Sequence, residues 1–424
     1  MATQDISDDE EELAELESTP AQERLFQQLT DSINRSLETS GKPSFTYVIG
    51  NNGTGKSRLL ARLAQHYCKG FEGQVRVIGC ISNSVFDRFT LRTSGPVQYL
   101  GARTSGNAVF HTAIDRTLCK VLLTALRQEK KRLHDLQGAL GMEFSFLIGQ
   151  ETLAGGSTDL KKIVDRRKLK GQSVAQVISK EDRDVLAHLV GSERKFTGLI
   201  RRQMDALLNL IALNPEVKLF VRRGTSEKMD FKQLSTGEQN RALTFAKVLS
   251  VAGERSVILI DEPEISLHLH WQMDFHETLH TLLENLSRFH VVVATHSPTI
   301  ISEGAKSGKH KTSSRVIVLD NTQGSPQRLT ATTYTFNQVL SHEQLVLNMF
   351  DTATYRTVAV DQEITKAILS GVEGGEPIPE IVEALSILRK KHGVTKPYFA
   401  HIDAAIAIIQ RQTLTHLQED PGNA

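Results

Sequence analysis

The chain has 424 residues, of which 39% are hydrophobic and 23% are charged, and its formal net charge is +1. This composition is ordinary for globular proteins and excludes collagen-like, low-complexity and largely disordered chains. No run approaches the roughly 18 apolar residues of a membrane-spanning helix, and the acidic N-terminus resembles neither a secretory signal nor a transit peptide. The three cysteines, Cys68, Cys80 and Cys119, have no CxxC spacing, so we expect reduced thiols in a cytoplasmic protein.

The charge is unevenly distributed along the chain. Residues 1–20 carry eight acidic side chains and no Lys or Arg, so the remainder carries a net charge of about +9. We expect the first 20 residues to be a solvated, disordered acidic tail. The mildly basic remainder allows an anionic partner but does not require one.

The hydrophobic pattern predicts an α/β fold with a mostly parallel central sheet. We expect helices near 21–37 and 56–68, and strands at 44–49 and 74–81. Four nearly all-apolar runs, at 217–221, 257–260, 290–294 and 315–319, suggest central strands covered on both faces.

The same pattern divides the chain into parts around one nucleotide-binding core. Residues 121–215 read as a helical insertion in that core, which also has a β-rich edge, and the chain is again mostly helical after about residue 336. The expected parts are an acidic tail (1–20), the first core segment (21–120), the insertion (121–215), the second core segment (216–335) and a helical region that contacts a partner or another copy (336–424).

A glycine-rich segment after the first strand matches G-x-x-x-x-G-K-S between a strand and a helix. Its glycines let successive backbone N–H groups face phosphate oxygens, and the helix N-terminus adds partial positive charge. Lys56 would reach the β- and γ-phosphates, and the Ser57 hydroxyl would bind Mg²⁺. The expected nucleotide-binding residues are Gly50, Asn51, Asn52, Gly53, Thr54, Gly55, Lys56, Ser57 and Arg58.

Two carboxylates end the apolar run at 257–260. Asp261, at the carboxyl end of a strand, is placed to hold Mg²⁺ through water beside the glycine-rich segment. Glu262 follows it and points elsewhere, because adjacent strand residues alternate in direction. Glu262 is therefore the candidate to position or activate the attacking water.

A third motif, LSTGEQ at 234–239, stands before an expected helix over 240–251. Ser235 and Glu238 have the S-x-x-E spacing of a capping box, which is a structural explanation. The functional alternative is that this helix N-terminus receives a second anion, with Gly237 letting phosphate approach the backbone. The spacing alone leaves both explanations open.

LSTGEQ resembles the signature motif of ABC-type ATPases, usually written LSGGQ, and its position before Asp261 fits that family's order. His296, directly after the strand at 290–294, occupies the place of the family's switch histidine. The resemblance implies that two copies pack head to tail, with ATP between the P-loop of one and the signature of the other. The implied roles are Lys56 and Ser57 in cis, Ser235, Thr236, Gly237 and Glu238 in trans, Glu262 as general base and His296 as γ-phosphate sensor.

The segment after Glu262 indicates which branch of the ABC-type ATPases the sequence resembles. Residues 261–272 read DEPEISLHLHWQ where transporter ATPases usually read DEPTSALD. EPEISLH, with ATHSPTII at 294–301, resembles the OLD/SMC-like branch. His268 and His270 have no third candidate ligand nearby, so we expect no metal site there. OLD nucleases carry a C-terminal Toprim domain with a glutamate and a D-x-D cluster, whereas Asp403 is an isolated acid on an apolar helix.

An ATPase without a nuclease motif resembles the stand-alone ATPase subunits of bacterial anti-phage systems such as the Septu and PARIS types. That resemblance implies an oligomeric, ATP-gated scaffold or sensor that controls a separate effector, such as a nuclease or toxin. The alternative is a DNA-repair or recombination ATPase that binds DNA through basic clusters of the insertion. A third function, the ATPase of a membrane transporter, is disfavoured by EPEISLH and by the long insertion.

The additional Mg²⁺ ligand of the family, the Q-loop glutamine, has two candidates. Gln98 lies in PVQYLG at 96–101, and Asn83 follows the strand at 74–81. The sequence leaves the choice between them open.

Overall fold

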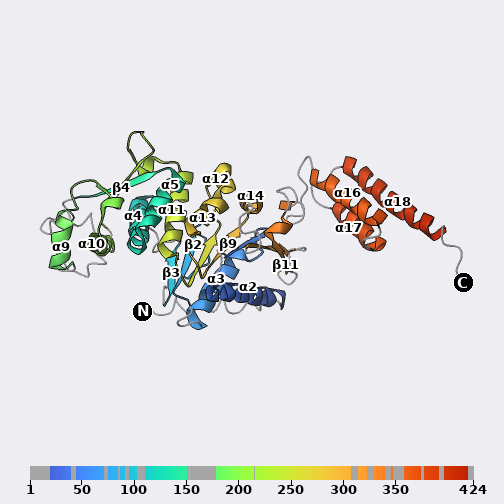
Figure 1. Cartoon of the computed structure of the whole chain (residues 1–424), viewed down its shortest axis with the longest axis horizontal. Coiled ribbons are helices and arrows are strands. Elements are labelled where there is room, and N and C mark those ends of the chain that lie inside the picture. The colour runs from blue at the N-terminus through green and yellow to red at the C-terminus, as the bar shows by residue number, and fades with distance from the viewer. Residues whose placement is uncertain are drawn as a thin grey trace, which may run out of the picture.

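The computed structural model places a sheet-containing body beside a separate group of helices, α16–α18 (Figure 1). The expected acidic tail and most of residues 150–177 lie outside the described residues. The structure describes residues 20–39, 44–70, 75–84, 86–90, 95–102, 110–149, 152, 178–213, 215–306, 314–321, 329–339, 345–346, 358–373, 377–390 and 396–418.

Seven of the described strands form the central sheet, in the order β11-β10-β1-β9-β8-β2-β3. Every neighbouring pair is parallel except β10 and β11, which are antiparallel. This confirms the predicted α/β fold with a mostly parallel sheet. The strands are β1 (Ser44–Gly50), β2 (Val77–Ser82), β3 (Val97–Leu100), β8 (Ser256–Asp261), β9 (Phe289–Thr295), β10 (Ser314–Asn321) and β11 (Leu329–Thr335).

Alternate residues of the central strands face two different hydrophobic cores. In β8, Ile258 and Ile260 join one core, while Val257 and Leu259 join the other. Helices cover both faces, which explains why these strands read as continuous apolar runs. The first face is covered by helices that include α4 (Phe110–Gln128), α11 (Thr236–Val251), α13 (Phe275–Leu283) and α14 (Pro298–Lys306), and the second by α2 (Pro20–Glu38) and α3 (Lys56–Gly70) (Figure 1).

A second, antiparallel sheet corrects one sequence prediction. The run at 217–221 was expected in the parallel sheet, but β6 (Val217–Arg222) pairs antiparallel with β4 (Glu143–Ile148) and β7 (Met229–Asp230). Its buried residues alternate with exposed ones such as Lys218, as expected for a strand covered on one face. β5 (Arg194–Lys195) completes this sheet beside β4.

The stretch expected as a helical insertion contains both helices and strands. Its helices are α5 (Lys130–Leu140), α9 (Lys180–Ala187) and α10 (Arg201–Ile211), together with the end of α4. It also contributes β4 and β5, which the helical pattern did not predict, and a short 3-10 helix, η3 (Phe196–Gly198).

The described part of the C-terminal region contains three long helices. The helices α16 (Val358–Glu373), α17 (Ile378–Lys390) and α18 (Lys396–Gln418) enclose a hydrophobic core of their own. Across the described segments, no helix is both long and apolar enough to span a membrane. The remaining described elements are η4 (Phe231–Gln233), α12 (Leu269–Met273) and η6 (Phe336–Gln338).

Candidate nucleotide-binding site

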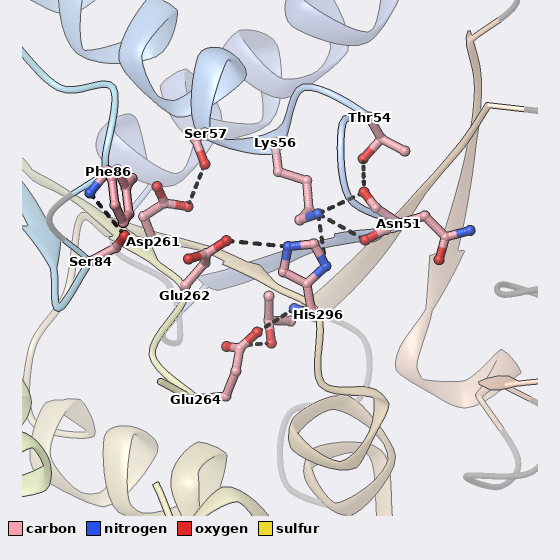
Figure 2. Close-up of polar contacts among 12 residues, drawn as sticks. Asn51, Thr54, Lys56, Ser57, Ser84, Phe86, Asp261, Glu262, Glu264 and His296 are labelled. Atoms are coloured by element: carbon pink, nitrogen blue, oxygen red, sulfur yellow. Dashed lines mark hydrogen bonds and ion pairs between the residues drawn. The ribbon is translucent and has the colours of Figure 1, made fainter. Parts of the chain in front are cut away.

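The predicted motifs meet at the carboxyl edge of the central sheet. β9 lies between β1 and β8. In register, Thr295 pairs with Ile49, and Asp261 pairs with both Ala294 and Ser82. The glycine-rich loop, Asp261 and the residues after β9 therefore emerge side by side (Figure 2). This edge is where ligands bind in open parallel sheets.

The glycine-rich loop has a backbone that requires glycine. Gly53 and Gly55 have φ angles of 83° and 89°, in a region that other residues rarely adopt. At Gly50, a Cβ atom would lie 2.4 Å from the carbonyl oxygen of Leu319. Thr54 closes the turn by donating its hydroxyl hydrogen to the carbonyl of Asn51 at 2.9 Å. The loop geometry therefore fits a phosphate-binding turn before α3.

Lys56 lies folded back inside this loop. Its Nζ donates to the carbonyl oxygens of Gly50 at 2.8 Å and Asn51 at 3.1 Å, and lies 3.2 Å from Nδ1 of His296. Burial lowers the pKa of Lys56 to about 8, although nearby carboxylates, Glu262 foremost, oppose the drop. A buried ammonium held only by neutral groups is available to an incoming phosphate.

Ser57 and Asp261 are the residues placed to hold a magnesium ion. The Ser57 hydroxyl donates to Oδ1 of Asp261 at 3.1 Å. With Mg²⁺ bound to the Ser57 hydroxyl, Asp261 would hold the ion through water. Burial raises the pKa of Asp261 to about 7, the Ser57 hydrogen bond opposes the rise, and Glu262 adds to it. A cation beside Asp261 would favour its charged form.

Glu262, His296 and Lys56 form one continuous series of contacts (Figure 2). Oε1 of Glu262 lies 3.2 Å from Nε2 of His296, whose Nδ1 faces Lys56. Burial and then the Lys56 charge lower the pKa of His296, so its ring is neutral near pH 7. Because Lys56 can only donate, Nδ1 accepts and Nε2 carries the hydrogen toward Glu262.

The backbone at Glu262 is in an unusual conformation. Its φ angle is 50°, in the left-handed region, and its N–H donates to the carbonyl of Ala294 at 2.9 Å. Such conformations cost free energy in residues other than glycine and cluster at functional sites. Here the conformation ends β8 and turns the Glu262 side chain toward His296.

Glu264 is a site residue that sequence reasoning missed. Its carboxylate accepts hydrogen bonds from the Thr295 hydroxyl at 2.8 Å and from the backbone N–H of His296. Burial raises the pKa of Glu264 even though these bonds oppose the rise. Glu264 therefore fixes the turn that carries His296. Its position two residues after Glu262 was the available signal.

The structure separates the two candidates for the additional magnesium ligand. Gln98 is exposed on β3 and pairs in register with Gly79, three residues before the end of β2. Asn83 directly follows Ser82, the partner of Asp261 in register. Oδ1 of Asn83 is buried without a hydrogen-bond partner among the described residues. Asn83, and not Gln98, therefore lies at the edge that carries Asp261.

The signature segment lies at the N-terminus of α11 and forms the predicted capping box. The Ser235 backbone N–H and hydroxyl each donate to Oε2 of Glu238 at 2.9 Å. Burial alone would raise the pKa of Glu238, but the Ser235 hydrogen bonds and the ion pair with Arg223 outweigh it and lower the pKa. Ser235 and Thr236 remain exposed, so the structural role leaves their outer side open to a ligand.

Gly237 has a packing role within the chain. A Cβ atom there would lie 2.6 Å from the carbonyl oxygen of Ser266 and 2.8 Å from Cζ3 of Trp271. Trp271 also lies against Arg241 of α11, whose guanidinium carbon is 5.7 Å from the ring centroid. The glycine therefore allows the segment after Glu262 to pack directly on the signature turn.

We expect Gly237→Ala to displace the Ser266–Trp271 contact and to destabilise the protein by about 1–3 kcal/mol, the usual cost of overpacking. Because Trp271 is the single tryptophan, its emission spectrum should shift in the variant. The matched control is Gly138→Ala in α5, where a Cβ atom meets nothing within 4 Å. An unshifted spectrum and an unchanged unfolding free energy for Gly237→Ala would contradict the packing argument.

Parts of the chain are similar to known proteins. Residues 143–302 match an AAA domain. The family model is described as "AAA domain, putative AbiEii toxin, Type IV TA system". The matched segment is less than half of the chain. It includes the signature segment, Asp261 and His296, and it begins after the P-loop.

The other similarities are short or weak. Protein ea59 of Escherichia phage lambda is 36% identical over 75 residues, which are 18% of this chain and 14% of that protein. An Smc head bound to the C-winged helix domain of ScpA has a TM-score of 0.22 and 9% identity, covering 29% of this chain and 33% of that one. A Pyrococcus furiosus Smc head bound to the C-terminal domain of ScpA also has a TM-score of 0.22 and is 10% identical. That similarity covers 52% of this chain and 57% of the other chain.

Other polar residues that the sequence singled out have local partners. His268 caps α12, and Nε2 of His270 lies 3.3 Å from Oδ2 of Asp274. Asp403 in α18 pairs with Arg389 in α17 at 3.1 Å. Within the described residues, no group of three or more His, Cys, Asp or Glu side chains is arranged to hold a metal ion.

Two described basic residues of the insertion, Arg132 and Arg202, have partners within the chain. Arg132 is 11% exposed in its side chain and donates to the carbonyl oxygens of Leu249 and Ala252, at 2.9 and 2.8 Å. Arg202 lies 3.4 Å from the Asp182 carboxylate. Lys161, Lys162 and residues 166–168 lie outside the described part of the chain. The other described members of these clusters, Lys130, Lys131 and Arg201, are exposed.

Lys247, in the middle of α11, is a second residue that the sequence analysis missed. Its side chain is buried beside the site, and Nζ donates to the carbonyl oxygen of Ser82 at 3.2 Å. Burial lowers the pKa of Lys247 to about 7, although the charge of Asp87 opposes the drop. Apolar residues before and after Lys247 were the available signal that it is enclosed.

This buried lysine predicts a pH dependence of stability. Between about pH 7 and 10.5, the unfolded chain carries the Lys247 proton and the folded chain does not, so the free energy of unfolding rises with pH. Below pH 7 the folded protein bears the whole cost of the buried charge. We expect Lys247→Met to be more stable than the parent at pH 6, by on the order of 1–4 kcal/mol, with a smaller difference at pH 9. An equal difference in unfolding free energy between Lys247→Met and the parent at both pH values, measured by urea unfolding, would contradict this.

Proposed function

We propose that this chain is an ABC-type ATPase that holds ATP and Mg²⁺ between two copies of itself. The observation that supports this most strongly is the contact series from Glu262 through His296 to Lys56, beside the Ser57–Asp261 pair. These side chains come from three separate segments, the start of α3, the end of β8 and the turn after β9, and converge on one glycine-rich turn. Such convergence of a base, a phosphate-binding cation and metal ligands suits phosphoryl transfer to water.

Each residue has a definite task in this reaction. Lys56 exchanges the loop carbonyls for phosphate oxygens, and Ser57 with Asp261 binds Mg²⁺, which neutralises phosphate charge when present. Asn83 adds its amide oxygen to the surroundings of that ion. Glu262 orients the attacking water and takes its proton.

His296 responds to the nucleotide through its two ring nitrogens. When Lys56 turns to the phosphates, Nδ1 of His296 loses its donor, and the ring becomes free to reorient toward the γ-phosphate. Glu264 keeps the backbone of that turn in place throughout.

The second copy supplies the signature turn. Ser235 and Thr236 are exposed at the positive end of α11, which suits a bound anion. Close to them, Leu269 and Met273 on α12 are 57% and 40% exposed, and a second copy would remove these apolar side chains from water. The ABC-type arrangement makes each ATP a bridge between two chains, so ATP stabilises the dimer and hydrolysis weakens it.

Mixing two inactive variants tests this arrangement. Lys56→Ala removes the phosphate-binding cation in cis, and Ser235→Arg blocks the signature in trans. A mixed dimer contains one composite site with both residues intact. We therefore expect each variant alone to be inactive and a 1:1 mixture to recover about a quarter of parental ATPase activity, since half the dimers are mixed and each has one good site.

The control mixture pairs Lys56→Ala with Glu262→Gln. Both residues act in cis on the same nucleotide, and a mixed dimer then has one damaged residue in each site. No recovery is expected. Failure of the first mixture to recover, with ATP-dependent dimers absent by light scattering, would overturn the two-copy site.

We further propose that the ATPase controls a separate effector in anti-phage defence. The match of residues 143–302 to a family described as a putative toxin of a toxin–antitoxin system supports a function exerted with a partner protein. The purified chain should co-elute with the product of a neighbouring gene, and the complex should respond to ATP. A chain whose neighbouring genes encode no effector, and which elutes alone, would contradict this role.

A further inference from the structure

Two side chains of α11 bond to consecutive residues at the end of β2. Lys247 Nζ donates to the carbonyl oxygen of Ser82 at 3.2 Å, and the Thr244 hydroxyl accepts from Nδ2 of Asn83 at 2.8 Å. Residues three apart lie on the same side of a helix, so both bonds come from one face of α11. Both contacts lie at the sheet edge that carries Asp261.

α11 and β2 are also in close contact further back along the strand. A Cβ atom on Gly79 would lie 2.5 Å from Cγ2 of Val251, the last residue of α11. The helix is therefore packed against β2 at its C-terminal end and hydrogen-bonded to it near its middle. Displacement of the end of β2 cannot leave this helix in place without breaking buried contacts.

The other end of α11 is the signature turn. Gly237 lies seven residues before Thr244, a distance of about 10 Å along the helix axis. There, the backbone of α11 packs directly on Trp271 and on the carbonyl of Ser266. One continuous helix thus joins the end of β2 to the turn proposed to contact the ATP of the second copy.

We propose that Lys247 and Thr244 are positioning residues that couple this chain's own nucleotide site to its signature turn through α11. The inference rests on the proposed function, because it assigns a task to the signature turn. When ATP and Mg²⁺ occupy the site, the end of β2 adjusts beside Asp261, and the Lys247 and Thr244 bonds carry that adjustment to Gly237 and Trp271.

The position of Lys247 suits this task. The charge of Asp87 acts on Lys247 and also on Asp261. Asp87 is fixed in place, because it accepts hydrogen bonds from the Phe89 N–H at 3.1 Å and the Tyr99 hydroxyl at 2.8 Å. Neutralising the acidic site with a cation changes the potential at Lys247, so the helix contact responds to occupancy as well as to shape.

Trp271 reports the coupling because it is the single tryptophan and packs on the signature turn. The test uses the full-length chain diluted until light scattering shows monomers with ATP, so that a second copy does not contribute. ATP binding, measured by calorimetry, is compared with the ATP-dependent change in tryptophan emission. In the parent protein, we expect the emission change to follow ATP saturation.

Three variants and one control separate coupling from stability. In Lys247→Met and Thr244→Val, ATP affinity should stay within about twofold, the Trp271 change should be lost, and kcat at dimer-forming concentration should fall about 2- to 30-fold with little change in KM. Thr244→Ser keeps the hydroxyl and should restore the parental response. Lys218→Met, on an exposed position of β6, should behave as the parent.

The outcomes are distinguishable. A parental Trp271 response in both Lys247→Met and Thr244→Val would overturn the coupling. A Trp271 emission that does not change when the parent protein binds ATP would overturn it as well. If Thr244→Ser and Thr244→Val lose stability and response equally, the contact is structural and the inference fails. A parent that binds no ATP would instead overturn the proposed function, and the inference with it.

Discussion

Glu262→Gln should bind ATP as the parent does and hydrolyse it about 10²- to 10⁴-fold more slowly, the usual loss when a general base is removed. The amide keeps the shape of the side chain and its contact with His296, so the loop after β8 should stay in place. Because ATP then persists between two copies, the ATP-bound dimer should accumulate. Single-turnover kinetics and light scattering measure the two effects.

A matched control for this prediction is Glu303→Gln in α14, which removes a carboxylate whose recorded partner is Lys306, on the same helix. Its turnover should equal that of the parent. Glu264→Gln is more informative, because it weakens the hydrogen bonds that hold the His296 turn and should reduce kcat less than Glu262→Gln. Parental turnover in Glu262→Gln would remove that residue from the role of base.

Much of this site was predictable because its parts are local in sequence. The glycine-rich turn needs positive φ angles at Gly53 and Gly55, and such a requirement leaves a direct mark on the sequence. Asp261 ends one fully buried strand and His296 follows another, and apolar runs covered on both faces are easily recognised. Adjacent parallel strands then bring their carboxyl ends together without further information.

The unpredicted features depend on contacts between distant segments. β6 was assigned to the wrong sheet because a short apolar run does not specify its partners, although Lys218, its second residue, favoured a strand with one exposed face. Lys247 lies in a helix that is buried around most of its circumference, and a lysine there reads as exposed until that packing is known.

Gly237 shows how one residue can satisfy two explanations. From the sequence, its small size was explained by the approach of a phosphate to the backbone. In the structure, the space that a Cβ atom would fill is taken by Trp271 and the Ser266 carbonyl. The packing at Gly237 therefore joins the signature turn to the segment after Glu262.

Lys56→Met should reduce ATP affinity about 10- to 100-fold, because one charge-assisted phosphate contact contributes about 1.5–3 kcal/mol. The same change should not destabilise the nucleotide-free protein. In that state the buried ammonium is held by the carbonyls of Gly50 and Asn51 and by His296. Burial lowers the pKa of Lys56 to about 8, so the charged side chain is less stable in the folded protein than in water. Calorimetry and thermal unfolding without nucleotide measure the two effects.

The prediction is specific because Lys56→Met should weaken ATP binding without lowering the stability of the nucleotide-free protein. A ligand at 100 times its dissociation constant stabilises a protein by about 2.7 kcal/mol. The same ATP concentration is about 1 to 10 times the dissociation constant expected for Lys56→Met and stabilises that variant by about 0.4–1.4 kcal/mol, so ATP should raise the melting temperature of the parent more than that of Lys56→Met. Lys306→Met, which removes an exposed lysine of α14, should keep the full ATP-dependent shift. If Lys56→Met lowered the stability of the nucleotide-free protein and kept the parental ATP affinity, Lys56 would stabilise the glycine-rich loop and would not bind phosphate.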